Sequence, residues 1–216
     1  ACVAGAAGPW LTLTWPGYTG VLQAVAPQRF AAALNQAPMQ KPVGIYPLDW
    51  LVTRLHVWDR PHLTAAHLLR QVFERARTFA EAKALLVETP IALPAIYILA
   101  GLGAEEACVI ERQPESAQVI EGDACAANAW QASSWPGRAR GHDNAQRVES
   151  LRSVPDSLDA AFEWLRPPVL NRRTRLAFVA DASTGSAIAQ GFEVHGPATA
   201  ILRWNPPRGT ASGTGQ

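Results

Sequence analysis

Apolar and small residues alternate with polar ones over several short stretches, a pattern typical of β-strands. The first such region runs from Leu11–Thr14 through Tyr18–Val25 to Arg29–Gln36. Pro27 lies in the short turn that separates the last two stretches and fixes its backbone. We therefore expect three consecutive strands in an antiparallel meander. Residues 1–8 are small and glycine-rich and have no capping signal, which predicts a frayed start.

Helical spacing replaces this alternation in the second quarter of the chain. Apolar residues recur three or four positions apart over Leu63–Ala76, which predicts an amphipathic helix. Thr78 is followed three residues later by Glu81, the spacing of a capping box, and this predicts a second helix over Phe79–Val87. The Pro- and Gly-punctuated stretch Gln40–Asp49 is expected to be a loop.

The second half of the chain repeats this order of strands and then helices. Strands are expected at Ala95–Ala100, Ala107–Glu111, Ala117–Glu121 and Ala124–Trp130, followed by an exposed loop at Gln131–His142. Helices are expected at Asn144–Val154, with Asp143 as N-cap, and at Leu158–Leu165, with Asp156 or Ser157 as N-cap. The last expected strands are Leu176–Ala180, Ala187–Phe192 and Thr199–Trp204.

Separate runs of strands and helices favour an α+β fold, in which antiparallel sheets carry helices on their outer faces. The 216 residues are enough for one substantial core, and we expect a single domain over residues 1–204. Residues 205–216 are rich in Pro, Gly, Ser and Thr and are expected to be disordered. A net charge of +1 gives no sign of nucleic-acid binding, and no apolar run has the length of a membrane span.

The three cysteines, Cys2, Cys108 and Cys125, are an odd number without metal-type spacing. We interpret Cys108 and Cys125 as small structural residues in strand-like runs, which favours a reducing, cytoplasmic compartment. The residues Asp49, His56, Asp59 and His62 match no zinc pattern, so we expect solvated loop side chains and no metal site. The eight tryptophans are expected in the core and at its rim, or in part along an apolar acyl pocket.

Three stretches carry a resemblance to a known family: GYTGVLQAVAPQRFAAALNQAP, ETPIALPAIYILAG and ACVIER. They resemble the acid ceramidase and N-acylethanolamine amidase branch of the choloylglycine hydrolase family, whose members are N-terminal-nucleophile (Ntn) amidases. The resemblance implies an αββα four-layer sandwich and hydrolysis of the linear amide of a small N-acyl amine, without a cofactor. Two alternatives stay open: an acyltransferase on the same scaffold, and a non-catalytic αββα domain. A homo-oligomer is also open.

The resemblance implies three site residues. Asn35 in ALNQAP and Asn128 in CAANAW match asparagines that form the oxyanion hole, and Arg147 in DNAQRVESLRS matches an arginine near the nucleophile. A carboxamide suits an oxyanion hole because it donates a hydrogen bond at any pH. The residues alone allow simpler interpretations. Asn35 can brace the turn before Pro38, Asn128 can end a strand, and Arg147 can be a solvated i,i+4 partner of Asp143.

The nucleophile that the family uses is a cysteine at the mature N-terminus, with an arginine and an aspartate in the following strands. Cys2 fits this pattern poorly, because the first basic residue is Arg29 and the first acidic residue is Asp49. The WPGYTG block also follows Cys2 by only a dozen residues. We therefore expect an N-terminally truncated Ntn fold that begins downstream of the nucleophile, and we expect this chain alone to be inactive.

Overall fold

The computed structural model describes residues 1–58, 60–132, 134–154 and 161–206. Within this part of the chain, seven consecutive strands form one antiparallel meander in the order of the sequence. They are β1 (Cys2–Gly5), β2 (Gly8–Thr12), β3 (Gln23–Ala26), β4 (Phe30–Gln36), β5 (Ala95–Ala100), β6 (Ala107–Arg112) and β7 (Ala117–Glu121). The expected turn between β3 and β4 is confirmed, and Gln28 adopts a positive φ of 58° there.

Strand β5 shows how one sheet supplies two cores. Successive side chains of a strand point to opposite faces. Tyr97 and Leu99 accordingly pack into the core beneath the helices, whereas Ile96 and Ile98 pack into a smaller cluster on the other face. Both faces of the sheet are therefore covered, which explains why AIYILA is a continuous apolar run instead of an alternating one.

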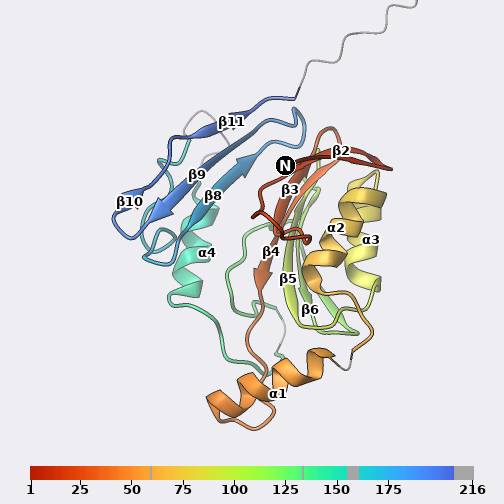
Figure 1. Cartoon of the computed structure of the whole chain (residues 1–216), viewed down its shortest axis with the longest axis vertical. Coiled ribbons are helices and arrows are strands. Elements are labelled where there is room, and N and C mark those ends of the chain that lie inside the picture. Colours follow the sequence, from red (N-terminus) through yellow and green to blue (C-terminus); the bar gives the residue numbers. More distant parts are fainter. Residues whose placement is uncertain (59, 133, 155–160, 207–216) are drawn as a thin grey trace, which may run out of the picture.

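Helices α2 (Ala65–Arg75) and α3 (Phe79–Glu88) cover the first face of this sheet (Figure 1). The predicted capping box is confirmed: the Thr78 hydroxyl accepts from the Glu81 backbone N–H at 3.1 Å, and the Glu81 carboxylate accepts from the Arg77 N–H at 2.7 Å. Thr64 caps α2, and its side chain accepts from the His67 backbone N–H. Satisfying these free N–H groups fixes where each helix begins.

Two buried arginines bind the C-terminal ends of the same two helices, α2 and α3. Arg29, in the turn just before β4, donates to the carbonyls of Phe73 and Ala76, at the end of α2. Arg112 of β6 donates to the carbonyls of Leu86 and Thr89, at the end of α3. A cation at a helix C-terminus satisfies free carbonyls and complements the helix dipole. Hydrogen bonds from one guanidinium thus hold the C-terminal end of each helix in place.

A second sheet packs against the other face of the first (Figure 1). It consists of β8 (Leu176–Ala180), β9 (Ala187–Glu193), β10 (Gly196–Pro197) and β11 (Leu202–Trp204). Ala182 and Ala187 meet Val25 of β3 between the sheets, while Phe162, Leu165 and Phe192 lie in a separate cluster beside β8 and β9.

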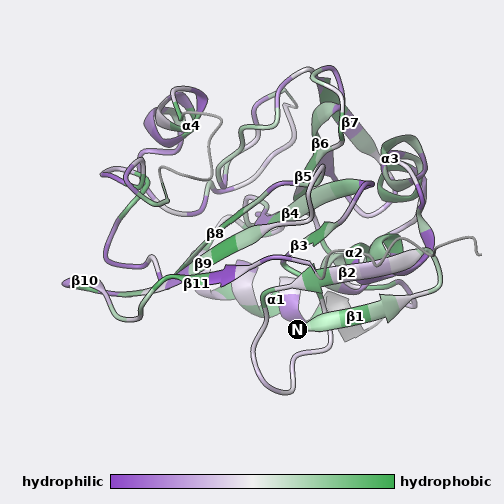
Figure 2. Cartoon of the chain, turned by 90° about the horizontal axis from the view of Figure 1, so that it is seen from above, coloured by the Kyte–Doolittle hydropathy of each residue, from purple (hydrophilic) through white to green (hydrophobic). Residues whose placement is uncertain are grey.

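Helix α4 (Asn144–Arg152) lies beside this second sheet, and its side chains bind the loop that follows β7. It is largely hydrophilic (Figure 2). Two packed antiparallel sheets, with α2 and α3 on the outer face of the first, agree with the αββα expectation.

Four local expectations differ from the structure. Residues 1–8 are not frayed, because Val3 of β1 pairs with Trp10 of β2. Tyr18–Val25 is a strand only from Gln23 onward. Ala124–Trp130 is a loop, which is held by side-chain hydrogen bonds instead of a strand ladder. Residues 161–165 form turns instead of a helix, and residues 155–160 lie outside the described part.

Helix α1 (Tyr46–Trp58) replaces part of the loop expected at Gln40–Asp49. Pro47 marks a loop by composition, but proline is also well tolerated in the first turn of a helix. Asp49 is fully buried and accepts from the N–H groups of Val43 and Gly44 at 2.8 and 2.9 Å, so the expectation of a solvated loop carboxylate was wrong.

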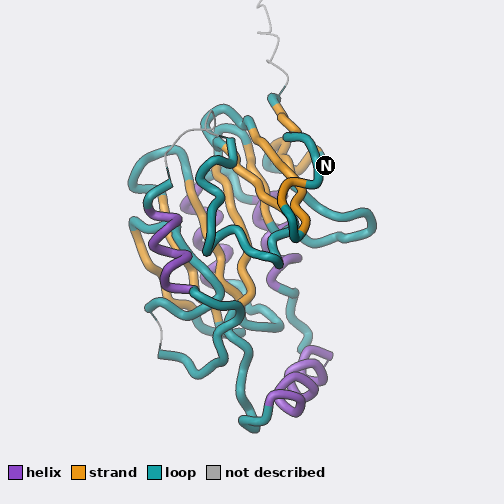
Figure 3. The backbone as a smooth tube through the Cα atoms, turned by 90° about the vertical axis from the view of Figure 1, so that its left-hand side faces the viewer, coloured by secondary structure: helices purple, strands orange, loops and turns teal. Residues whose placement is uncertain are grey.

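Helix α1 stands away from the two sheets (Figure 3). Large apolar side chains in and before it are exposed: Val43, Ile45, Tyr46, Leu48, Trp50, Leu51 and Leu55. The described residues contain no helix long and apolar enough to cross a membrane.

Candidate active site

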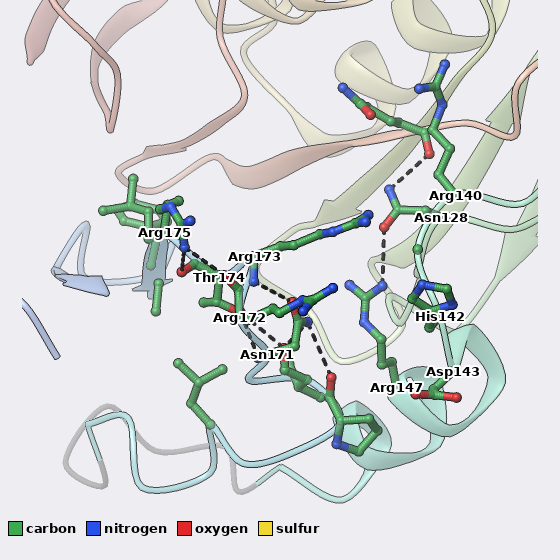
Figure 4. Close-up of a pocket in the computed structure, with 18 of the residues that line it drawn as sticks. Asn128, Arg140, His142, Asp143, Arg147, Asn171, Arg172, Arg173, Thr174 and Arg175 are labelled. Atoms are coloured by element: carbon green, nitrogen blue, oxygen red, sulfur yellow. Dashed lines mark hydrogen bonds between the residues drawn. The ribbon is translucent and has the colours of Figure 1, made fainter. Parts of the chain in front are cut away.

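A cavity of about 670 Å³ opens between the two sheets and α4. Its walls come from the ends of β3 and β4, the start of α4, and the segment that leads into β8. A volume of this size is typical of small-molecule sites. Asn128 and Arg147 both line it, so the fold brings these two of the three expected site residues together (Figure 4).

Asn128 is held from four directions. Its backbone N–H donates to Asn144 Oδ1 at 3.1 Å, and its carbonyl accepts from the Arg140 N–H at 3.0 Å. Its side-chain amide donates one hydrogen to the Gln36 carbonyl at 3.0 Å, and its Oδ1 accepts from Arg147 Nη1 at 3.4 Å. The second amide hydrogen has no partner among the described residues. A fixed carboxamide with one spare donor therefore lies on the cavity wall.

Arg147 is a partly buried guanidinium on the inner side of α4. Its Nη1 also reaches Asn144 Oδ1 at 3.4 Å. Burial lowers the pKa of Arg147, and the charge of Asp143 partly opposes that shift. The Arg147 Nε is buried and has no partner among the described residues. No ion pair links Arg147 to Asp143 in this part of the chain, so the solvated i,i+4 interpretation does not describe its contacts.

Asp143 occupies the expected N-cap position of α4 but does not cap it. Its backbone is left-handed, with a φ of 53°, and its side chain makes no capping hydrogen bond. Its carbonyl still accepts the first bond of the helix, from the Arg147 N–H at 2.8 Å.

Asn35 takes a different position from Asn128. It lies near the end of β4, and its Nδ2 donates to the carbonyls of Ala126 and Ala127 at 3.1 and 3.4 Å. It is not among the residues that line the cavity. The amide nitrogen thus binds two neighbouring backbone carbonyls of the loop that carries Asn128. In this structure Asn35 therefore braces that loop.

Arg140 was not among the residues singled out from the sequence. It lines the cavity, its Nε donates to the Ala37 carbonyl at 2.9 Å, and its backbone N–H holds Asn128. The stretch GRARGHDN lies in a segment that composition marks only as an exposed loop. No periodicity indicates that this loop folds back against the end of β4.

No cysteine is among the described residues that line the cavity. Cys2 is exposed on β1 and borders a separate, smaller apolar cavity. Burial raises the pKa of the Cys108 thiol to about 11, and burial with the nearby Asp123 charge raises that of Cys125. A cysteine nucleophile needs a lowered pKa. Cys108 and Cys125 are therefore unsuited to that role.

We expect the three thiols to react with DTNB at very different rates at pH 8. Exposed Cys2 reacts first and half-buried Cys125 more slowly, while Cys108 reacts only after unfolding, because it is fully buried and protonated. Absorbance at 412 nm counts the thiols, and a Cys108→Ala variant identifies the slow one. Three thiols that react at one rate in the native protein would contradict the burial of Cys108.

A metal site receives no support. The described residues contain no group of three His, Cys, Asp or Glu side chains that could hold an ion. The Asp49 carboxylate accepts hydrogen bonds from backbone N–H groups. His62 is half-buried. Asp59 and the side chain of His56 lie outside the described part.

The layered fold defines the class of structure first: an αββα sandwich built on two antiparallel sheets. Among solved structures, the chain is similar to a Caenorhabditis elegans N-acylethanolamine-hydrolyzing acid amidase ortholog, with a TM-score of 0.57 and 18% identity. The match covers 84% of this chain and 74% of that one. At this identity the likeness shows the fold alone.

Sequence comparison then identifies relatives among the acid ceramidases. The chain is 34% identical over 112 residues to the acid ceramidase of Homo sapiens and 30% identical over 112 residues to that of Rattus norvegicus. Each match covers 51% of this chain and 27% of the relative, so the matched part spans about a quarter of those proteins. No family profile matches the chain. The resemblance to the acid ceramidase and N-acylethanolamine amidase branch is confirmed.

Proposed function

We propose that the full-length protein hydrolyses the amide bond of an N-acyl amine by the cysteine Ntn mechanism. The observation that carries this proposal is the Asn128 carboxamide, which is fixed on the wall of the cavity with one N–H free of other described partners. A preorganised neutral donor of this kind stabilises the oxyanion that forms when an amide carbonyl is attacked. The acid ceramidase relatives and the matching fold support the same chemistry.

The thiolate that attacks comes, in this proposal, from a residue outside 1–216, because Cys108 and Cys125 are unsuited and Cys2 borders the other cavity. It adds to the amide carbonyl carbon while Asn128 donates to the oxygen. The C–N bond then breaks, the amine leaves with a proton from the nucleophile's own α-amine, and a thioester remains. Water cleaves the thioester to a carboxylic acid and restores the thiol. No cofactor takes part in these steps.

Asn35 and Arg147 complete the proposed site. Asn35 positions Asn128 through the carbonyls of Ala126 and Ala127. Arg147 holds the Asn128 oxygen, which turns the amide N–H toward the cavity. The cytoplasmic location and the oligomeric state stay predictions.

The test is an assay of the full-length gene product, and of chain 1–216 alone, against a panel of N-acyl amines. We expect the full-length protein to release free acid and amine, and the chain alone to release neither. If an added amine captures most of the acyl group, the protein is an acyltransferase. No release by the full-length protein on any panel member would leave a non-catalytic domain and overturn the proposal.

A further inference from the structure

The loop that carries Asn128 returns to the part of the chain that follows β4. Met39 and Arg138 exchange two backbone hydrogen bonds there, at 2.9 and 2.8 Å, as an isolated antiparallel bridge. Gly137 lies so close to Pro38 that a Cβ at position 137 would be 2.7 Å from the proline Cβ. The returning part of the loop therefore packs directly against the segment after β4.

The register of this bridge places Arg140 opposite Ala37. In an antiparallel ladder, pairs that exchange two hydrogen bonds alternate with pairs that exchange none. Counted from Met39 and Arg138, the next hydrogen-bonded pair of a regular ladder would be Ala37 and Arg140. The backbone N–H of Arg140 instead donates to the Asn128 carbonyl at 3.0 Å. The donor that a regular ladder would use is therefore bound to Asn128.

The side chain of Arg140 supplies a donor in its place. Its Nε donates to the Ala37 carbonyl at 2.9 Å, across the same pair of positions. The Arg140 carbonyl is also turned out of the ladder, and it accepts from Asn144 Nδ2 at 3.1 Å. Arg140 thus holds two parts of the site at once: its side chain binds the segment after β4, and its backbone binds Asn128.

The carbonyl that fixes the Asn128 carboxamide is the neighbour of the one that Arg140 binds. Gln36 accepts one hydrogen of the Asn128 amide at 3.0 Å, and Ala37 follows it directly. Gln36 is also the last residue of β4 that pairs with β5, so the sheet ladder does not fix the carbonyl after it. The Arg140 Nε does so. The direction of the second Asn128 amide hydrogen therefore depends on Arg140 through both its backbone and its side chain.

We infer that Arg140 is a positioning residue for the oxyanion donor Asn128, and that it acts through its Nε hydrogen bond and not through its charge. The inference rests on the proposed function for the word oxyanion, but the effect of Arg140 on Asn128 can be measured without any hydrolysis. Arg140 is exposed, and within the described residues its side chain makes only the hydrogen bond to Ala37. Its replacement is therefore expected to disturb the site without unfolding the protein.

Three substitutions separate the Nε donor from charge and from shape. Arg140→Gln places an amide N–H where the Nε lies, because the two side chains have the same length up to that atom, and it removes the charge. Arg140→Met fills similar space without a donor. Arg138→Ala is the matched control, because the Arg138 guanidinium lies over the Tyr46 ring at 5.3 Å and the backbone bridge to Met39 does not need it.

The first measurement is the ¹⁵N–¹H spectrum of the side-chain amides of chain 1–216. The Asn128 pair of signals is identified by its loss in Asn128→Ala. We expect Arg140→Met to shift this pair more than Arg138→Ala does, and Arg140→Gln to bring it back toward its original position. Circular dichroism checks that each variant is folded, and Arg140→Ala serves if Arg140→Met is not.

The second measurement is steady-state kinetics of the full-length protein on the best amide of the panel. Arg140→Met is expected to lower kcat about tenfold with little change in KM, because one lost hydrogen bond weakens a site by about that factor. Arg140→Gln is expected to recover most of the loss. In an Asn128→Ala background, Arg140→Met is expected to lower kcat no further, because its effect passes through Asn128.

Each outcome decides between the alternatives. Asn128 amide signals that stay in place in a folded Arg140→Met protein would overturn the inference. An added loss in the double variant would do the same, as would a raised KM that Arg140→Gln does not restore, which would make the guanidinium a direct substrate contact. If the full-length protein hydrolyses no amide of the panel, the proposed function fails, whereas the amide spectrum still decides whether Arg140 positions Asn128.

Discussion

Replacement of Asn128 by alanine in the full-length protein is expected to lower kcat for amide hydrolysis by about 100- to 1,000-fold, which is the usual cost of removing one oxyanion donor. The KM is expected to change much less, because the hydrogen bond strengthens only as the carbonyl oxygen becomes charged. Steady-state kinetics on the best amide of the panel measures both constants.

The neighbouring Asn144 offers a matched control. It accepts from the Asn128 N–H and from Arg147, but it does not line the cavity. We expect Asn144→Ala to lower kcat by less than about tenfold, because it removes a support and not a donor to the substrate. Full activity in Asn128→Ala, or an equal loss in both variants, would reject Asn128 as the oxyanion donor.

Arg112→Met is expected to lower the free energy of unfolding by about 3 kcal/mol or more. The guanidinium is fully buried and donates to the carbonyls of Leu86, Thr89 and Ser116. Methionine fills similar space but leaves three carbonyls without their donor, and each unsatisfied buried polar group costs about 1–3 kcal/mol. Urea denaturation followed by tryptophan fluorescence gives the change.

Two further variants test the cause of this loss. Arg77→Met changes an exposed arginine on the same side of the molecule and is expected to stay within about 0.5 kcal/mol of the unmodified chain. Arg112→Lys keeps the charge but cannot direct donors at three separated carbonyls, so we expect it to restore less than half of the loss. Full restoration by lysine would show that charge, and not hydrogen bonding, stabilises the end of α3.

The sequence alone determined most of the secondary structure around the main core. The periodicity of the apolar residues predicted the first and last residues of β5, β6 and β7 to within one position. The capping box predicted the start of α3. These features follow from local rules, because a strand or a helix start is specified by residues only a few positions apart. The αββα order then followed from the grouping of strands and helices, together with the family resemblance.

Other elements depend on partners that are distant in the chain. Strand β1 forms because it pairs with β2, although its own residues are small and carry no signal. The helix α1 begins at Tyr46 in a stretch whose proline was interpreted as a loop marker. Ala124–Trp130 has the composition of a strand, but its backbone carbonyls bind side chains instead of a neighbouring strand.

The candidate site shows the same division. The sequence, through its resemblance, singled out Asn35, Asn128 and Arg147, but it could not say which of the two carboxamides reaches the cavity. The answer depended on a loop about 90 residues beyond β4, because its carbonyls bind the Asn35 amide. The Asn128 amide on the same loop donates one hydrogen to Gln36 and keeps the other free of described partners. The gathering of five arginines around one cavity was likewise decided by tertiary structure alone, because they come from two segments on opposite walls. Sequence periodicity records which face of an element is buried, whereas only packing decides which side chains of separate segments share one space.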